Sequence, residues 1–273
     1  MSAAETFVVD AEGDARLAVD VNGKGMATRP DLLLVTGLGG TSAFWEPLVA
    51  PLAERFRVIR LDQRGVARST RGSVPKVDID VLARDCHAVL KHIGATRALL
   101  VGHSTGGVIL QTMAIQNEAP IRGLILSGTW LKPNRYMTEL FNSRKAVLRE
   151  LPQAYAAQLA FSAYPPDWLN ENWGRLDAAV AGALTDPAAR EAMLERIDAI
   201  IAYDHSAEVH RITAPQLILG AEDDLIVPAF LQRELMQALP QAQSHFFTTG
   251  GHFFPITQTD GFLAQMWAFA EKI

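Results

Sequence analysis

The stretch Ala98-Leu99-Leu100-Val101-Gly102-His103-Ser104-Thr105-Gly106 has the pattern of a short buried strand that runs into a tight turn. Its last five residues match G-x-S-x-G, and residues 108–115 behind them have the composition of a helix. A serine on a sharp strand-to-helix turn is lifted above the sheet edge, with its hydroxyl exposed. The start of the following helix favours negative charge that develops there. The stretch therefore predicts a nucleophilic Ser104; the alternative is an ordinary glycine-rich connection.

Apolar runs recur on both sides of this turn. The runs at 32–35 and 98–101 are continuous, and shorter or interrupted runs cover residues 58–61, 124–126, 216–219 and 244–247. Runs that are apolar on both faces indicate strands covered by helices on both sides, as in a parallel sheet. The amphipathic stretch 79–93 is typical of a crossover helix, and residues 6–9 and 17–21 predict an antiparallel hairpin. The expected fold class is α/β, with a mostly parallel, doubly wound sheet.

The segment 129–210 breaks this alternation because it contains no convincing strand and reads as helical. It holds all four tyrosines and three of the five tryptophans. This predicts a helical cap at 129–210 inserted into a core formed by residues 1–128 and 211–273. Aromatic side chains in such an insertion are candidates for lining a pocket. The candidates are Trp130, Phe141, Tyr155, Phe161, Tyr164, Trp168 and Trp173, and of these we take Trp130, Tyr164 and Trp168 as substrate-binding. The alternative is that they form the cap's own core.

A serine hydroxyl needs a base, and the base needs a carboxylate that orients it. Four histidines follow Ser104 in the chain: His205, His210, His245 and His252. His245 lies inside a strand run, and the first two lie at the end of the helical segment. His252 follows a strand and the pair Gly250-Gly251, which places it on a loop at the sheet edge. We therefore expect His252 to be the base; the alternative is a surface histidine without a role.

The acid is expected just after the strand at 216–219, where two aspartates compete. Counting from Gly220 favours Asp223, whereas counting back from Pro228 favours Asp224. Successive residues point in different directions, so only one carboxylate can meet the imidazole. We expect Asp223 to be the acid and keep Asp224 as the alternative.

An oxyanion hole needs two backbone N–H groups near the nucleophile. One is expected from Thr105, the residue after Ser104, and the other from the loop after the strand at 32–35. That loop is Thr36-Gly37-Leu38-Gly39-Gly40, and its glycines allow a close approach to a substrate. We therefore expect Leu38 to be the second donor.

With these residues in place, the chain resembles the α/β-hydrolase superfamily over nearly its whole length. The loop at 37–40 looks like the oxyanion loop, with Thr36 where many members have histidine. Asp62-Gln63-Arg64-Gly65-Val66-Ala67-Arg68-Ser69 is similar to the superfamily's D-x-R-G-x-G-x-S stretch, with Ala67 in place of the second glycine. The later half is most similar to the aminoacrylate hydrolases of pyrimidine degradation. That similarity rests on Ser127-Gly128-Thr129-Trp130, Tyr164-Pro165-Pro166-Asp167-Trp168, Asp223-Asp224-Leu225-Ile226-Val227-Pro228 and Gly250-Gly251-His252.

The resemblance implies a cofactor-independent serine hydrolase that acts on a small amide, enamine or ester through an acyl-enzyme. Carboxylesterase, enol-lactonase and carbon–carbon bond hydrolase stay open, because all of them can share this triad. A serine at position 104 argues against epoxide hydrolase and haloalkane dehalogenase, which use aspartate there. A rival from another class is a ligand receptor on a hydrolase scaffold, since the fold does not fix the function.

Composition limits the remaining possibilities. The chain has 273 residues, 49% of them hydrophobic and 20% charged, which excludes general disorder. Its 25 basic and 30 acidic residues give a net charge of −5 without a basic block, which disfavours a nucleic-acid partner. No apolar run approaches the roughly 18 residues of a membrane span. The start of the chain, Met1-Ser2-Ala3-Ala4-Glu5, lacks the features of a signal peptide.

These patterns predict a cytoplasmic protein with a small-molecule substrate, no membrane partner, and a homodimer left open. Cys86 is the single cysteine and cannot form an internal disulfide. No H-E-x-x-H, paired Cys/His spacing, G-x-G-x-x-G or Walker A sequence occurs. We therefore expect neither a metal nor a cofactor.

Overall fold

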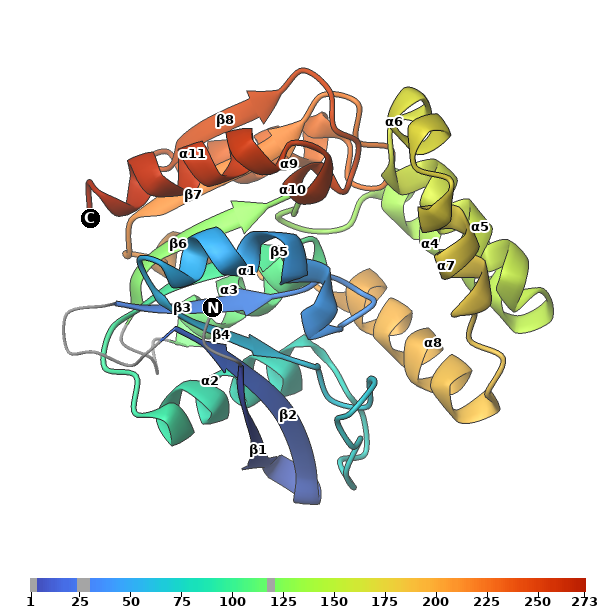
Figure 1. Cartoon of the computed structure of the whole chain (residues 1–273), viewed down its shortest axis with the longest axis horizontal. Coiled ribbons are helices and arrows are strands. Elements are labelled where there is room, and N and C mark those ends of the chain that lie inside the picture. Colours follow the sequence, from blue (N-terminus) through green and yellow to red (C-terminus); the bar gives the residue numbers. More distant parts are fainter. Residues whose placement is uncertain (1–3, 24–29, 117–120) are drawn as a thin grey trace.

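The computed structural model describes residues 4–23, 30–116 and 121–273 of the chain. Residues 1–3, which belong to the start considered for a signal peptide, lie outside the described residues. The structure confirms the expected α/β class: one eight-stranded sheet is flanked by helices (Figure 1). The strands are β1 (Glu5–Ala11), β2 (Ala15–Asn22), β3 (Asp31–Val35), β4 (Arg57–Leu61), β5 (Ala98–His103), β6 (Ile121–Ser127), β7 (Gln216–Ala221) and β8 (Gln243–Phe247).

The strand order in the sheet is β1-β2-β4-β3-β5-β6-β7-β8. β1 and β2 form the expected antiparallel hairpin around a 3-10 turn at Glu12–Asp14. β2 is also antiparallel to β4, and all later neighbours pair in parallel. The carboxyl ends of the parallel strands therefore meet at one edge of the sheet, where ligands bind in open α/β folds.

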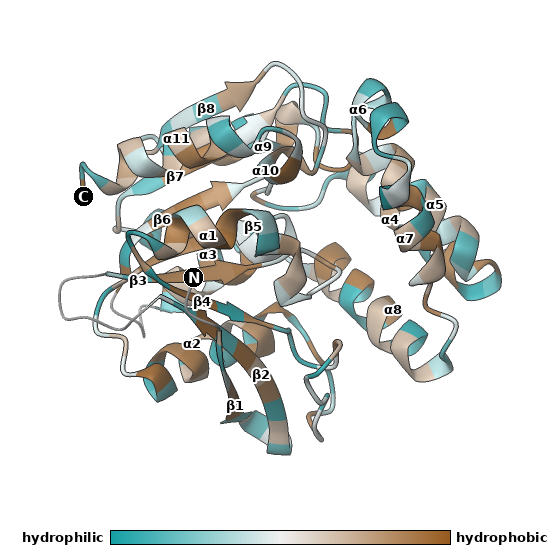
Figure 2. Cartoon of the chain, in the orientation of Figure 1, coloured by the Kyte–Doolittle hydropathy of each residue, from teal (hydrophilic) through white to brown (hydrophobic). Residues whose placement is uncertain are grey.

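Each face of the sheet buries its own set of side chains. On β3, Leu33 and Val35 pack in one cluster, while Leu32 and Leu34 pack in the other. The first cluster includes residues of α2 (Ile79–Ile93), α3 (Thr105–Gln116) and α9 (Ala229–Ala238). The second includes residues of α1 (Glu46–Ala53), α10 (Phe254–Thr257) and α11 (Thr259–Ala270). Figure 2 shows the central strands as largely hydrophobic, as expected for strands covered on both sides.

The helix expected at 79–93 begins and ends as its capping residues require. The Asp78 side chain accepts a hydrogen bond from the Val81 N–H at 3.0 Å, so it caps the start. Gly94 ends α2 in the left-handed conformation, with φ of 69°. Ile79 and Leu82 are buried on the face toward the sheet.

Between Ser127 and Gln216 the chain forms helices and no strand. The helices are α4 (Arg135–Glu150), α5 (Pro152–Ala163), α6 (Pro166–Glu171), α7 (Gly174–Ala181) and α8 (Pro187–Ala202), followed by a 3-10 turn at Val209–Arg211. Figure 1 shows these α-helices side by side at one end of the sheet. We call residues 135–202 the helical block.

The helical block is attached to the sheet layer through α8. Glu195 forms an ion pair with Arg71 at 2.7 Å and accepts a hydrogen bond from the Val77 N–H. The buried Arg196 donates to the backbone oxygen of Arg64 at 3.0 Å. By contrast, α7 buries none of its residues. The block is therefore anchored at one side and exposed at another.

Within the described ranges, no helix is both long and apolar enough to cross a membrane.

Candidate active site

Ser104 lies on the turn between β5 and α3 with a backbone φ of 55°. That left-handed conformation is uncommon for a residue with a side chain, and it is stored strain at a tight turn. The Ser104 N–H donates to the Ser127 carbonyl at 2.8 Å, which fixes the turn against β6. The Ser104 side chain is thus held at the carboxyl edge of the sheet, as the sequence predicts.

The glycines around Ser104 are required by close backbone approaches. A Cβ on Gly102 would lie 2.3 Å from the Gly106 carbonyl oxygen. A Cβ on Gly106 would lie 2.1 Å from the Val35 carbonyl oxygen. Neither position has room for a side chain, so the pattern around Ser104 reflects packing of β3, β5 and α3.

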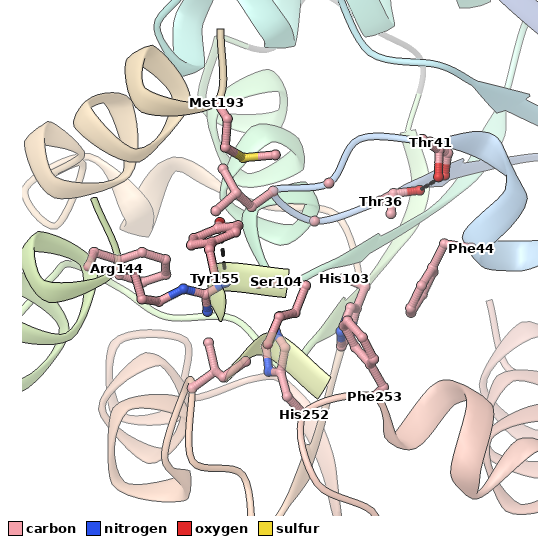
Figure 3. A pocket seen from close by; sticks show the side chains of 16 residues that line it. Thr36, Thr41, Phe44, His103, Ser104, Arg144, Tyr155, Met193, His252 and Phe253 are labelled. Atoms are coloured by element: carbon pink, nitrogen blue, oxygen red, sulfur yellow. Dashed lines mark hydrogen bonds between the residues drawn. The ribbon is translucent and has the colours of Figure 1, made fainter. Parts of the chain in front are cut away.

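His252 is buried on the loop after β8, and its Nδ1 lies 2.8 Å from Asp224 Oδ2. An ionised carboxylate only accepts hydrogen bonds, so Nδ1 carries the proton and Nε2 is the free ring nitrogen. Asp224 is itself held in place: its Oδ1 accepts from the Ile226 and Val227 N–H groups at 2.9 and 2.8 Å. His252 and Ser104 both line one cavity (Figure 3).

The preference for Asp223 as the partner of His252 is corrected by these contacts. Asp223 accepts hydrogen bonds from the Thr249 hydroxyl and from the Gly250 and Gly251 N–H groups, at 2.7 to 3.1 Å. Its carboxylate therefore fixes the loop that carries His252 and does not contact the imidazole. The alternative that the sequence left open, Asp224, makes the contact.

The other histidines considered as bases lie elsewhere. His205 stacks on Tyr203 with ring centroids 5.1 Å apart, and His245 packs edge-on against Phe247 on β8. Neither they nor His210 line the cavity that contains Ser104.

Leu38 lies in the loop between β3 and the 3-10 turn at Ser42–Trp45, and it lines the same cavity as Ser104. The Gly40 N–H donates to the Gly37 carbonyl at 3.0 Å and closes the loop. A Cβ on Gly37 would lie 2.9 Å from the Cβ of Ser104, so the loop approaches the serine closely. The Leu38 N–H donates to none of the described residues. Thr105 starts α3, and the first N–H groups of a helix have no partner within it.

The segment after β4 holds this loop in place. Gln63 donates from its side chain to the Thr36 carbonyl at 2.6 Å and from its N–H to the Gly40 carbonyl at 2.8 Å. Ala67, which replaces the second glycine of the superfamily pattern, keeps the left-handed backbone with φ of 48°. The departure from the pattern is therefore tolerated without a change of turn, at the cost of strain at one alanine.

Arg68 links two buried carboxylates at the base of this segment. Its guanidinium lies 2.7 Å from Asp20 and 2.6 Å from Asp62. Burial raises the pKa of each carboxyl, but the hydrogen bonds and charge of Arg68, together with hydrogen bonds from Ser42 and, for Asp20, from Thr6, hold both pKa values below the usual 3.8. Asp62 in turn accepts a hydrogen bond from the Ser42 N–H at 2.8 Å.

Replacing Arg68 by glutamine is expected to lower the free energy of unfolding at pH 7 by about 1–2 kcal/mol. The effect is modest because the Arg68 side chain is 46% exposed. A lowered carboxyl pKa contributes stability above its unfolded value, and that stability is lost as pH falls through the folded value. The difference between variant and wild type should therefore be constant above about pH 5 and shrink below pH 4.

Urea unfolding across this pH range measures that difference. The matched control is Arg84→Gln, because Arg84 forms a solvent-exposed ion pair with Glu12, and it should change stability by less than about 0.5 kcal/mol. A deficit in Arg68→Gln that stays the same down to pH 3 would contradict the role assigned to the two carboxylates.

The cavity at Ser104 has a volume of about 260 Å³. Its lining from the helical block consists of Phe141, Arg144, Tyr155, Leu159 and Met193. The candidates Trp130, Tyr164 and Trp168 do not line it, which corrects that expectation. Trp130 is fully buried in the core beside the sheet. Tyr164 and Trp168 stack on one another at 4.7 Å, and Tyr164 packs on Phe253, which itself lines the cavity.

His103 also lines the cavity, a position that the sequence reasoning did not single out. Its ring stacks on Phe44 at 5.2 Å, and its Nδ1 lies 3.1 Å from the Ser127 hydroxyl. Burial, together with the charge of the neighbouring His252, lowers the pKa of His103 well below its ordinary value. His103 is therefore a neutral wall of the cavity. Its signal was direct adjacency to Ser104 at the end of an apolar strand.

Among the described residues, no group of three or more His, Cys, Asp or Glu side chains is placed to hold a metal ion.

Comparison with known proteins identifies the family. A family model described as the alpha/beta hydrolase fold matches residues 30–259. The chain belongs to this family. A protein of Caulobacter vibrioides (strain NA1000 / CB15N) named "Putative carbamate hydrolase RutD" is 32% identical over 256 residues, covering 93% of this chain and 95% of that protein. A protein of the same name from Variovorax paradoxus (strain S110) is 34% identical over 251 residues, covering 91% and 94%.

Solved structures agree on the fold of this α/β hydrolase. The enol-lactonase of Burkholderia xenovorans LB400 superposes with a TM-score of 0.86 at 24% identity, covering 97% of this chain and 100% of that one. Together with the relatives, the family supports a hydrolase that acts on a small molecule.

Proposed function

We propose that this protein is a cofactor-independent serine hydrolase that acts on a small amide, enamine or ester through an acyl-enzyme. The observation that carries the proposal is the shared cavity of Ser104 and His252, in which His252 is bonded to the buried carboxylate of Asp224. A hydroxyl, a carboxylate and an imidazole in this order along the chain form the triad of the fold. The relatives' name, which mentions carbamate hydrolysis, agrees with acyl chemistry on a small substrate.

In the proposed reaction with an amide or ester, Ser104 Oγ attacks the carbonyl carbon while His252 Nε2 takes the hydroxyl proton. Asp224 keeps the imidazole in the correct tautomer and stabilises the imidazolium. The Leu38 and Thr105 N–H groups stabilise the oxyanion of the tetrahedral intermediate. The leaving group departs with the proton from His252. Water, deprotonated by His252, then attacks the acyl carbon, the bond from that carbon to Ser104 Oγ breaks, and His252 returns the proton to Ser104 Oγ.

Steady-state turnover separates this enzyme from a ligand receptor built on the same scaffold. A panel of small esters, lactones, enamines and a carbamate should include substrates with kcat/KM in the ordinary range for enzymes, above about 10⁴ M⁻¹ s⁻¹. Tight binding of panel members without turnover would instead support the receptor.

We further propose that the segment 129–210 is a cap that selects the substrate and takes no part in bond breaking, and that residues 1–128 and 211–273 form the catalytic core. Ser104, Asp224 and His252 come from strand-end turns on the packed sheet, which hold side chains to the tolerance that catalysis needs. The helical block supplies Phe141, Leu159 and other apolar wall residues. Such walls shape the pocket and exclude water.

Met193 tests this division because it lies between two cavities. It lines the cavity at Ser104 and a second one of about 350 Å³ that also borders Val66 and Leu184. Met193→Ala should join the two spaces and raise kcat/KM for hexanoate esters relative to acetate esters by roughly tenfold, as expected for a few methylenes in an apolar pocket. Labelling of Ser104 by a small acylating probe should keep its rate.

Trp168→Ala is the matched control, because Trp168 belongs to the helical block but not to the cavity wall. Its relative rates on the two esters should stay within about twofold of wild type. If Met193→Ala slowed both esters and the probe equally, with an unchanged circular dichroism spectrum, the block would be supporting the catalytic geometry itself.

A further inference from the structure

Arg144 is the one side chain with a permanent charge among the described residues that line the cavity at Ser104, and none of those residues is acidic. It comes from α4 and is 7% exposed. Figure 3 shows its guanidinium extending beside Tyr155 toward the part of the cavity where Ser104 and His252 lie. A buried positive charge thus faces the proposed reaction centre across an otherwise neutral space.

The protein contacts of this guanidinium are few. Arg144 Nη2 donates to the Tyr155 hydroxyl at 3.3 Å, a long hydrogen bond. The guanidinium carbon lies 5.0 Å from the centroid of the Tyr155 ring and 5.5 Å from that of Phe141. No described carboxylate lies within ion-pair distance of Arg144. The remaining guanidinium N–H groups therefore have no acceptor among the described residues.

Two other basic residues of the helical block, Lys145 and Arg196, have acceptors in the protein. Lys145, the next residue on α4, pairs with Asp198. Arg196 is buried but donates to the Arg64 carbonyl and to the Gln63 side chain. Arg144 thus differs from Lys145 and Arg196: each of those two has an acceptor in the protein, whereas the guanidinium of Arg144 faces the cavity.

A buried charge is costly unless an opposite charge or hydrogen bonds compensate it. A guanidinium offers five N–H donors in a planar fork that fits a carboxylate with two parallel hydrogen bonds. Stacking on aromatic rings orients the fork without satisfying those donors. Asp224, the acid of the site, is already bonded to His252 and to two backbone N–H groups. The remaining donors of Arg144 face the cavity, where the carboxylate of a ligand can take the place of water.

We propose that Arg144 binds a carboxylate of the substrate, and that this carboxylate is a separate group from the carbon that Ser104 attacks. The inference rests on the proposed hydrolase function and narrows its substrate to small carboxylate-bearing esters or amides. The walls between the two ends, which include Leu159, Met193 and Ile226, are apolar. A cavity of about 260 Å³ accommodates a short chain that joins the carboxylate to the reacting carbonyl. Tyr155 positions the guanidinium.

Two pairs of esters test this proposal, each pairing a carboxylate with an isopropyl group of similar shape. Methyl hydrogen succinate against methyl 4-methylpentanoate places the charge on the acyl half. Acetoxyacetate against isobutyl acetate places it on the leaving half. Wild type should prefer the anionic ester of at least one pair by about 10- to 100-fold in kcat/KM, the range of a charge-assisted hydrogen-bonded contact. The pair that shows the preference identifies the half that carries the carboxylate.

Arg144→Gln should remove the preference through a rise in KM, with kcat nearly unchanged, because the contact is made equally before and during the reaction. The ratio of its rates on the anionic and neutral esters of that pair should fall to about one, whatever the change in the neutral rates. Arg144→Lys keeps the charge without the fork and should retain part of the preference. Tyr155→Phe removes the long hydrogen bond and keeps the ring, so most of the preference should persist.

The outcomes separate this proposal from the hydrolase function. Hydrolysis of neutral esters without an anionic preference would overturn the role of Arg144 and leave the serine hydrolase standing. The role of Arg144 is also overturned if Arg144→Gln and Arg144→Lys lower only the melting temperature, since Arg144 would then be a structural stacking partner. If no ester is hydrolysed, calorimetric titration with methyl hydrogen succinate decides. Binding that Arg144→Gln weakens at least tenfold supports the carboxylate site, and absence of binding to wild type overturns it.

Discussion

Ser104→Ala is expected to lower kcat/KM by at least about 10⁴-fold on every substrate of the wild-type enzyme. The substitution removes one oxygen atom and keeps the Cβ, so the left-handed backbone and its bond to the Ser127 carbonyl are retained. The activity that is left would come from binding and oxyanion stabilisation alone. Steady-state kinetics on the best substrate of the panel measures the loss.

Ser127→Ala is the matched control for this experiment. Ser127 is a buried serine at the end of the neighbouring strand β6, and its hydroxyl contacts only the neutral ring of His103. Its loss should leave activity within about tenfold of wild type. Ser104→Ala activity within tenfold of wild type, with an intact circular dichroism spectrum, would rule out the serine mechanism.

Asp224→Asn is expected to lower kcat by about 10³–10⁴-fold, because the amide favours the wrong imidazole tautomer. An asparagine oxygen can still accept the Ile226 and Val227 N–H bonds, so the turn after β7 should survive. Stopped-flow kinetics of acylation and thermal unfolding, measured on the same preparation, separate a chemical defect from a folding defect.

Asp223→Asn serves as the control, because it is expected to affect stability more than kcat. An amide can accept only part of the three hydrogen bonds from Thr249, Gly250 and Gly251, so the free energy of unfolding should fall by about 1–2 kcal/mol. The loss of kcat should be far smaller than for Asp224→Asn. The reverse order of kcat losses would make Asp223 the acid.

Much of the fold could be predicted from the sequence, because its main signals are local. The strands from β3 to β7 are mostly apolar, and side chains on them alternate between the two buried faces, as Leu33 and Leu34 do. α2 was recognisable from the amphipathic spacing of its apolar residues. α1 and α9 were not identified, since each is short and gives a weaker periodic signal than α2.

The choice between Asp223 and Asp224 could not be made from spacing. Both lie in the turn after β7, where neighbouring side chains point in different directions. The deciding partners are the backbone N–H groups of Gly250 and Gly251, which bind Asp223 and leave Asp224 for His252. These contacts join residues 28 positions apart in the chain. No local pattern reports them.

The residues that line the cavity could not be predicted from the sequence either. Aromatic content pointed to Tyr164 and Trp168, but these rings stack on each other beside the cavity. Arg144 looks like any surface arginine of an amphipathic helix, because its burial depends on how α4 packs against α5 and α8. Only tertiary packing distinguishes it from Arg149 on the same helix.

The central claim is that Ser104 carries the acyl group during turnover. It is tested most directly by mixing the enzyme with p-nitrophenyl acetate, quenching in acid at successive times, and measuring the mass of the peptide that contains Ser104. The account predicts an acetyl group on Ser104 that forms and decays at the rates of the catalytic cycle. Full turnover with no acetylated Ser104 at any time, or with the acetyl group on another residue, would contradict it.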